Sequence, residues 1–316
     1  MQKFIDQLVK AIETHDAESL PMAAHYRATE NGVPAALRHM ETFNCFDKVN
    51  CIGTTLEDKA TNTFFVALNA AFGSKEGVVL VRVKIENELF TEVEIEVLLS
   101  RSNTGFWFTP HDMMELKPLF DAPVPQDKKI SREELDYVGH CVLDNAYDGS
   151  KYGREETCML MEAGGVVYEN SGYAKLINPH CPPDAFPEKD IRVPIPMGIA
   201  PNRPAGENIR ILAIDEERGL VASCFDVDGV VSPYLVSDET STCFVPETML
   251  EGHHMSLLPE FFEGKSASRE MRATGATIDI VKMSGMNVAV LMQYTNMRPY
   301  GTRTCWRKET TDGLKY

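Results

Sequence analysis

The sequence predicts an α+β protein in which one helix–strand unit occurs twice. The first copy reads Ala11-Ile12-Glu13-Thr14-His15-Asp16 and continues to Thr29-Glu30-Asn31-Gly32, and the second reads Val142-Leu143-Asp144-Asn145-Ala146-Tyr147-Asp148 and continues to Met161-Glu162-Ala163-Gly164. Asp16 precedes Glu30 by 14 residues, as Asp148 precedes Glu162, so the two copies align without a gap. Two copies predict two candidate pockets.

The composition limits the class of protein. A chain of 316 residues with 43% hydrophobic and 25% charged residues is typical of a soluble globular protein of two ordinary domains. The net charge of −16 argues against nucleic acid and against an anionic membrane surface as partners, although solubility alone also explains it. We find no signal peptide or long apolar segment, so we expect a cytoplasmic protein. The eight cysteines show no C-x-x-C pair, so we expect no metal.

The first half of the chain predicts one helix and a series of strands. Apolar residues at helical spacing predict a helix over residues 2–14, and residues 25–33 predict a strand that ends in a glycine turn. A short helix begun by a proline is expected over 34–42, followed by strands over 49–55, 63–69, 78–86 and 90–99. In the strand over 78–86, Arg82 and Lys84 alternate with valines. In the strand over 90–99, three glutamates alternate with valine and isoleucine: Glu92, Glu94 and Glu96. Antiparallel pairing would set these bases opposite the acids, and we interpret them as a solvated outer face.

The second half follows a predicted linker over 118–130. Ser131-Arg132-Glu133-Glu134 matches a capping box and predicts the start of a helix. A strand is expected at 158–161, a Pro-rich insertion at 178–206, a hairpin over 209–214 and 220–226, and a second insertion at about 233–270. The closing strands, 277–282 and 287–294, end the fold. The last is apolar on both faces, which predicts packing against another sheet, either of the other copy or of another subunit.

Several short motifs resemble those of a known family. Residues 144–150, the hairpin Ile214-Asp215-Glu216-Glu217-Arg218-Gly219-Leu220-Val221, and Pro299-Tyr300-Gly301 with Trp306 resemble a tandem SnoaL-like group of the nuclear transport factor 2-like superfamily. The resemblance implies two tandem cone-shaped domains with curved antiparallel sheets, at 1–117 and 131–316, each around an apolar pocket. Relatives include cofactor-independent isomerases, cyclases, dehydratases and lyases. The second copy departs from the group's Glu-Asn-Gly pattern by reading Glu162-Ala163-Gly164.

The strand of the first copy carries the candidate catalytic residues. Tyr26 and Glu30 share one face of this strand, and His25, Arg27 and Thr29 share the other. An acid in an apolar cone would have a raised pKa and could act as a general base. The alternative is that Glu30 closes a turn, because Glu162 occupies the same place in the second copy. We name Tyr26, Glu30 and His25 as candidate catalytic residues.

The candidate substrate-binding residues are more scattered. Arg27 shares the strand with the catalytic candidates, and His111 follows an aromatic stretch that could line the seam between the domains. Tyr173, Lys175 and His180 lie in or beside the Pro-rich insertion, which could be a lid. For each of them an ordinary surface or packing role is the competing interpretation.

Two functions are compatible with these residues. The first is a cofactor-independent lyase, dehydratase or isomerase acting on a hydrophobic aromatic or polycyclic oxygenated molecule, for example a lignin-derived diarylpropane. The second is a non-catalytic small-molecule-binding protein or dimerisation scaffold. For either we expect no cofactor, and a homodimer or a higher homo-oligomer. The absence of P-loop, G-x-G-x-x-G, G-x-S-x-G and H-E-x-x-H patterns argues against nucleotide enzymes, serine hydrolases and zincins.

Overall fold

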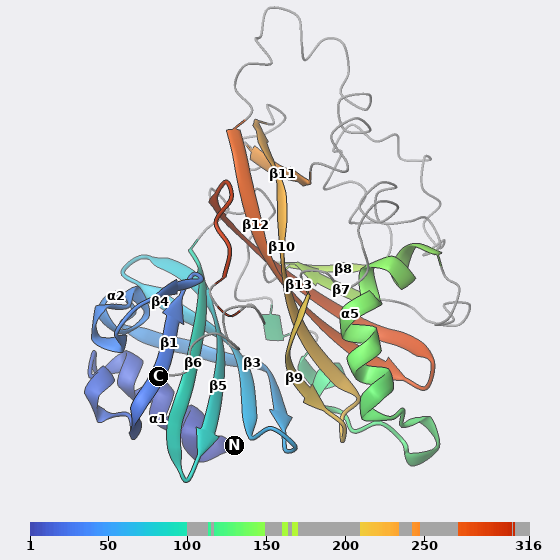
Figure 1. Cartoon of the computed structure of the whole chain (residues 1–316), viewed down its shortest axis with the longest axis horizontal. Helices are drawn as coiled ribbons and strands as arrows, with labels where there is room; N and C mark the ends of the chain where they lie inside the picture. Colours follow the sequence, from blue (N-terminus) through green and yellow to red (C-terminus); the bar gives the residue numbers. More distant parts are fainter. Residues whose placement is uncertain are drawn as a thin grey trace, which may run out of the picture.

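The protein is a mixed α+β fold with two curved sheets, seen in a computed structural model of the chain (Figure 1). The structure describes residues 1–99, 113–114, 117–148, 160–163, 166–169, 209–233, 242–246, 271–304 and 306. In this part of the chain the sheets pack against each other, with helices α1 and α2 outside the first and helix α5 outside the second.

The first sheet is formed by residues 22–98. Its strands run in the order β2-β1-β6-β5-β4-β3, and β1 is parallel to β6 while the other neighbours are antiparallel. The bounds are α1 (Gln2–Glu13), η1 (Ala17–Ser19), β1 (Met22–Glu30), β2 (Val33–Pro34), η2 (Leu37–His39), α2 (Glu41–Cys45), β3 (Lys48–Asp58), β4 (Thr63–Phe72), β5 (Lys75–Glu86) and β6 (Leu89–Leu98).

The second sheet follows a short connecting region and helix α5. Its strands run in the order β11-β10-β12-β13-β7-β8, and β9 also pairs with β10. The bounds are α4 (Lys117–Asp121), η4 (Gln126–Lys128), α5 (Arg132–Asp148), β7 (Leu160–Ala163), β8 (Val166–Glu169), β9 (Arg210–Asp215), β10 (Leu220–Pro233), β11 (Thr242–Pro246), β12 (Met271–Ser284) and β13 (Asn287–Pro299).

The helix-facing side of the first sheet is filled by apolar side chains. Leu8, Ala11 and Ile12 of α1 and Phe43 of α2 are buried there. They pack on the alternating apolar residues that the sequence pattern assigned to one face of β5 and β6, among them Val79, Val81, Val83, Val93, Ile95 and Val97. The predicted period-two alternation is confirmed, and the helices cover this face of the sheet.

The opposite side of the first sheet packs against the second sheet. A shared apolar cluster joins Phe65 and Leu80 of the first sheet to Ile280, Met292 and Tyr294 of the second. The prediction that the closing strands pack against another sheet is therefore confirmed, and the partner is the other sheet of the same chain.

The charged face of β5 and β6 lies within this contact. The predicted pairs are confirmed, because Arg82 lies opposite Glu94 and Lys84 opposite Glu92. The interpretation of the charges as a solvated outer face was wrong, since Glu94 and Glu96 are only 7% and 6% exposed. Period-two alternation separates an apolar face from a charged one, but it does not say whether a second sheet covers the charged face.

The two sheets share several details of strand pairing. The strand after the long helix region is parallel to the last strand in both, β1 to β6 and β7 to β13. A bulge interrupts the last hairpin at the same place, since Lys84 pairs with Glu92 and Ile85 with Phe90, while Lys282 pairs with Val290 and Met283 with Val288. A bulge that recurs at one position is a built-in feature of the strand pair.

The pairing also corrects the alignment of the two copies. Glu30 pairs with Val33 across its turn, and the residue in that position of the second hairpin is Ala163, which pairs with Val166. The gapless alignment that placed Glu162 opposite Glu30 was therefore wrong by one residue. Because side chains alternate along a strand, a shift of one residue moves a side chain to the other face.

Other predicted elements agree in part. Residues 34–42 form β2, a 3-10 turn and the start of α2 rather than one helix. The capping box is confirmed, because the Glu134 N–H donates to Ser131 Oγ at 3.2 Å and the Ser131 N–H donates to Glu134 Oε2 at 3.1 Å. The region predicted as a linker contains α4, whose Phe120 is buried in the core between the sheets.

Candidate functional site

Glu30 is held by the helix that follows its strand. Its carboxylate accepts hydrogen bonds from the Glu41 N–H at 2.6 Å, the Thr42 N–H at 2.9 Å and Thr42 Oγ1 at 2.7 Å. Both oxygens are used at the first turn of α2, where N–H groups lack partners within the helix and a negative charge is favourable. This geometry agrees with the structural alternative for Glu30.

The neighbouring candidates lie at the surface. Relative to β6, β1 shifts register between Met22 and Arg27, so three extra residues bulge from the strand and the simple alternation does not hold there. His25 is exposed and Tyr26 is 37% exposed. The Arg27 guanidinium lies 3.9 Å from the centre of the Trp306 ring. The structure thus brings Arg27 to Trp306.

The other predicted substrate-binding residues fall elsewhere. His111, Tyr173, Lys175 and His180 lie outside the described residues.

Asn31 and Gly32 explain the rest of the Glu-Asn-Gly motif. Asn31 Oδ1 accepts the Val97 N–H at 2.9 Å and Asn296 Nδ2 at 3.1 Å, which ties the turn to both sheets. Gly32 has φ +75°, and a Cβ placed on it would lie 2.4 Å from Arg298 Nη1. Glycine is therefore favoured at this position for two reasons, the positive φ of its backbone and the short distance to the Arg298 side chain.

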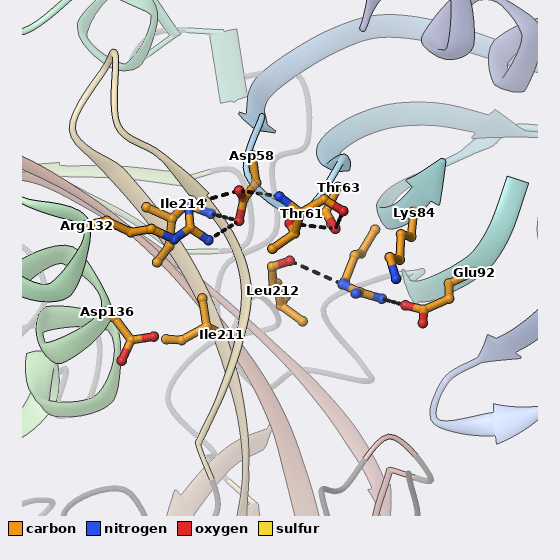
Figure 2. A pocket seen from close by; sticks show the side chains of 11 residues that line it. Asp58, Thr61, Thr63, Lys84, Glu92, Arg132, Asp136, Ile211, Leu212 and Ile214 are labelled. Atoms are coloured by element: carbon orange, nitrogen blue, oxygen red, sulfur yellow. Dashed lines mark hydrogen bonds and ion pairs between the residues drawn. The ribbon is translucent and has the colours of Figure 1, made fainter. Parts of the chain in front are cut away.

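A pocket of about 280 Å³ opens between the two sheets, at the turn that joins β3 to β4 (Figure 2). The first sheet and the β3–β4 turn form one wall, and β9 and the first turns of α5 form the other. The lining residues are Asp58, Thr61, Thr63, Arg82, Lys84, Glu92, Arg132, Asp136, Ile211, Leu212 and Ile214. Three cations and three anions line it, so the formal charges of the lining cancel.

The edge strands meet beside this pocket through a reciprocal contact. Asp58 ends β3 and accepts the Ile214 N–H at 3.2 Å, while Asp215 ends β9 and accepts the Glu57 N–H at 3.1 Å. Each aspartate begins a four-residue turn, and each receives the N–H of the residue that precedes the other. The two hairpins therefore contact each other in an approximately two-fold symmetric manner.

The two arginines of the pocket are bound to protein partners. Arg132 makes two hydrogen bonds with Asp58, at 2.9 and 2.7 Å, and Arg82 donates to Glu92 at 2.8 Å and to the Leu212 carbonyl at 3.2 Å. Burial by itself raises the pKa of Asp58. The hydrogen bonds from Arg132 and the Ile214 N–H lower this pKa by more than burial raises it, so the pKa of Asp58 lies below its usual value. Arg132 and Asp58 thus form a charged contact between helix α5 and the end of β3.

Lys84 and Asp136 are bound differently. The Lys84 ammonium lies 2.7 Å from Glu86, and Asp136 Oδ2 lies 3.4 Å from His140 Nδ1. Neither Glu86 nor His140 lines the pocket, and half of the side-chain surface of Glu86 and of Asp136 is open to water, at 50% and 53%. These two charges are the most accessible of the lining set in the residues described.

A second lysine occupies the position in β12 that matches Lys84. Lys282 is buried and donates to the carbonyls of Leu119, Phe120 and Ala122 at the end of α4. Burial, followed by repulsion from Arg218, lowers the pKa of Lys282 to about 8. Its bonds to α4 are those of a cation at a helix C-terminus.

Sequence reasoning missed this pocket. Arg82, Lys84 and Glu92 were noticed as a charged face, and Arg132 only as part of a capping box. The signal that could have found the site was the double-sided apolar strand near the C-terminus. Because this strand packs against the first sheet, the charged face of β5 and β6 is covered by the second sheet.

The described residues contain no group of three His, Cys, Asp or Glu side chains placed to hold a metal ion. Within the same residues, no helix combines the length and the apolar character needed to span a bilayer.

Comparisons with known proteins add little to this geometry. No protein-family model and no curated protein matches the chain. Among solved structures, the chain is similar to a de novo designed protein with a curved β-sheet (13% identity, TM-score 0.25, 30% of this chain and 83% of that one). It is also similar to a putative ketosteroid isomerase from Kribbella flavida (12%, 0.25, 30% and 75%) and to a DUF4783 family protein from Bacteroides ovatus (13%, 0.23, 28% and 91%). At these TM-scores the likenesses carry no functional argument.

Proposed function

We propose that the chain is a tandem nuclear transport factor 2-like protein that binds a small molecule in the pocket between its two repeats. The shared strand order, the matching bulges and the reciprocal aspartate contacts support the duplication. In this architecture the first repeat is a scaffold, because helices cover one face of its sheet and Glu30 is bound by α2.

The observation that carries the binding proposal is the pocket itself. It joins an apolar wall (Ile211, Leu212 and Ile214) to six charged and two hydroxyl-bearing side chains, so it offers both apolar and polar contacts and is more polar than most small-molecule sites. Its volume of about 280 Å³ lies just below the roughly 300–1,000 Å³ of common ligand pockets. The ligand is therefore a short-chain or single-ring molecule, smaller than the polycyclic or diarylpropane compounds expected from the sequence.

The test is a thermal-shift screen of small oxygenated metabolites with the full chain. Thr61→Trp fills the pocket from an exposed turn, and Lys59→Trp adds the same ring on that turn outside the pocket. We expect a ligand that raises the melting temperature of the wild type and of Lys59→Trp but not of Thr61→Trp. A ligand that stabilises all three equally would place binding elsewhere and refute the proposal.

A second candidate is the cofactor-independent lyase, dehydratase or isomerase. The observation that favours it is the Asp136–His140 pair, whose carboxylate lines the pocket, since imidazole and carboxylate groups are the commonest general acids and bases. Mass spectrometry of the screened compounds, with no cofactor added, would detect loss of water or formaldehyde. We expect His140→Gln to abolish such turnover, and a fully active His140→Gln protein would remove this pair from the mechanism.

A further inference from the structure

We propose that the pocket between the repeats binds a small zwitterion, with Lys84 holding a carboxylate and Asp136 holding an ammonium group. This inference rests on the proposed function, which makes the pocket a ligand site, and adds the chemical class of the ligand. Its basis is the arrangement of charges around the apolar wall.

The arginines of the pocket are not free to bind a ligand. Asp58 is only 2% exposed, and Arg132 satisfies it with two hydrogen bonds. Arg82 is fixed by Glu92 and by the Leu212 carbonyl of the opposite sheet. Taking either arginine away would leave a buried or half-buried carboxylate without its partner, which is strongly unfavourable.

Lys84 and Asp136 can exchange their partners easily. Each pairs with a residue outside the pocket, in a contact that water reaches. Exposed ion pairs contribute little to stability, so a ligand carboxylate can replace Glu86 at Lys84, and a ligand ammonium can replace His140 at Asp136. The pocket thus has one available charge of each sign.

The two available charges come from different walls. Lys84 extends from β5 and Asp136 from α5, and Figure 2 shows them well apart, with Ile211 and Leu212 between them in the view. A simple anion would leave Asp136 unmatched, and a simple cation would leave Lys84 unmatched. A molecule with opposite charges joined by a short apolar skeleton satisfies both ends and covers the isoleucine and leucine side chains.

The hydroxyl groups fit the same ligand. Thr61 and Thr63 line the pocket on the β3–β4 turn and its following strand, next to Asp58. Thr61 Oγ1 donates to Thr63 Oγ1 at 3.0 Å. This pair adds a neutral polar edge, so the site can also take a hydroxyl or carbonyl oxygen on the ligand.

Isothermal titration calorimetry with the full chain tests the charge pattern. The probes are leucine, leucinamide (which lacks the carboxylate), 4-methylpentanoate (which lacks the ammonium) and 4-methylpentanamide (which lacks both charges). We expect leucine to bind at least tenfold more tightly than leucinamide or 4-methylpentanoate, because each of these leaves one end unmatched.

Matched variants assign the two ends. Lys84→Met should weaken leucine at least tenfold and leave leucinamide unchanged, and Lys84→Arg should restore most of the leucine affinity. Asp136→Asn should weaken leucine and leucinamide but not 4-methylpentanoate. Glu86→Gln, which changes the lysine's partner outside the pocket, should bind leucine as tightly as the wild type or more tightly. Circular dichroism melts confirm that each variant is folded.

The outcomes separate this inference from the proposed function. If 4-methylpentanamide binds as tightly as leucine and Thr61→Trp blocks both, the pocket is a ligand site but the zwitterion proposal is overturned. If leucine binding is unaffected by both Lys84→Met and Asp136→Asn, the charge assignment is wrong. If no probe binds, the zwitterion proposal fails, and only the metabolite screen with Thr61→Trp then decides on the proposed function.

Discussion

Replacing Trp306 with alanine should destabilise the protein by about 3–5 kcal/mol, the usual cost of truncating a buried tryptophan. Trp306 is only 4% exposed, donates its Nε1–H to Thr29 Oγ1 at 2.7 Å and lies under the Arg27 guanidinium. The residues before it are anchored to the second sheet, because Arg303 binds Asp228 and the Thr304 N–H donates to Asp226. The tryptophan therefore joins the segment that follows β13 to the first sheet.

Urea unfolding followed by far-UV circular dichroism measures this cost, since tryptophan fluorescence would change with the substitution itself. Trp306→Phe keeps most of the ring contacts and loses the hydrogen bond, so we expect about 1–2 kcal/mol. Tyr300→Ala is the control in the same segment, because Tyr300 is 42% exposed, and should change the free energy of unfolding by less than about 1 kcal/mol. A Trp306→Ala protein within about 1 kcal/mol of the wild type would refute the argument.

Three further predictions concern the turn, the Arg132–Asp58 contact and the quaternary structure. Gly32→Ala should cost about 2–5 kcal/mol in urea unfolding, from backbone strain and a clash with an arginine, whereas Gly73→Ala, with φ +56° and open space around it, should cost only about 1–2 kcal/mol; equal costs would contradict this. The lowered pKa of Asp58 stabilises the fold above the unfolded pKa of about 3.9. This stability is lost as the pH falls through the folded pKa, so Asp58→Asn should flatten the acid limb of the stability–pH curve, and Asp127→Asn, on an exposed carboxylate, should leave it unchanged. Because the apolar side chains of β12 and β13 that face the first sheet are covered within the chain, light scattering should give a monomer of 35.3 kDa rather than the expected homodimer; a mass of twice that value would contradict this.

A fifth prediction concerns Glu30. If its role is to hold the first turn of α2, Glu30→Gln should destabilise the protein by about 1–2 kcal/mol, the order of a lost helix cap, and leave ligand binding unchanged. Thermal unfolding together with calorimetry distinguishes the two roles. If Glu30→Gln is as stable as the wild type but no longer binds the ligand, Glu30 has a functional rather than a structural role.

The sequence predicts the local structure of this chain better than its site. Period-two patterns located β5 and β6 and the pairing of Arg82 with Glu94, because alternation assigns each side chain to one of the two faces of a strand. The same patterns could not say what covers each face. The helices that fill the first sheet and the sheet that covers its charges are brought there by contacts between residues far apart in sequence.

The candidate catalytic strand shows a second limit. Alternation along β1 assumed a regular strand, and the bulge before Arg27 breaks that assumption without any glycine or proline to announce it. Glu30 was open to two interpretations, and its hydrogen bonds to α2 depend on a helix shorter than the one predicted. The pocket residues come from both halves of the chain, so no local motif could have collected them.

The equivalence of Lys84 and Lys282 has a consequence for stoichiometry. An approximately two-fold arrangement of hairpins would offer a cavity at each lysine, yet the ammonium of Lys282 is enclosed by the carbonyl groups at the end of α4. The space at Lys282 is filled by the end of α4, whereas the space at Lys84 forms the pocket. A titration of this chain should therefore saturate at a single equivalent of ligand, even though a lysine stands at the matching register position of each sheet.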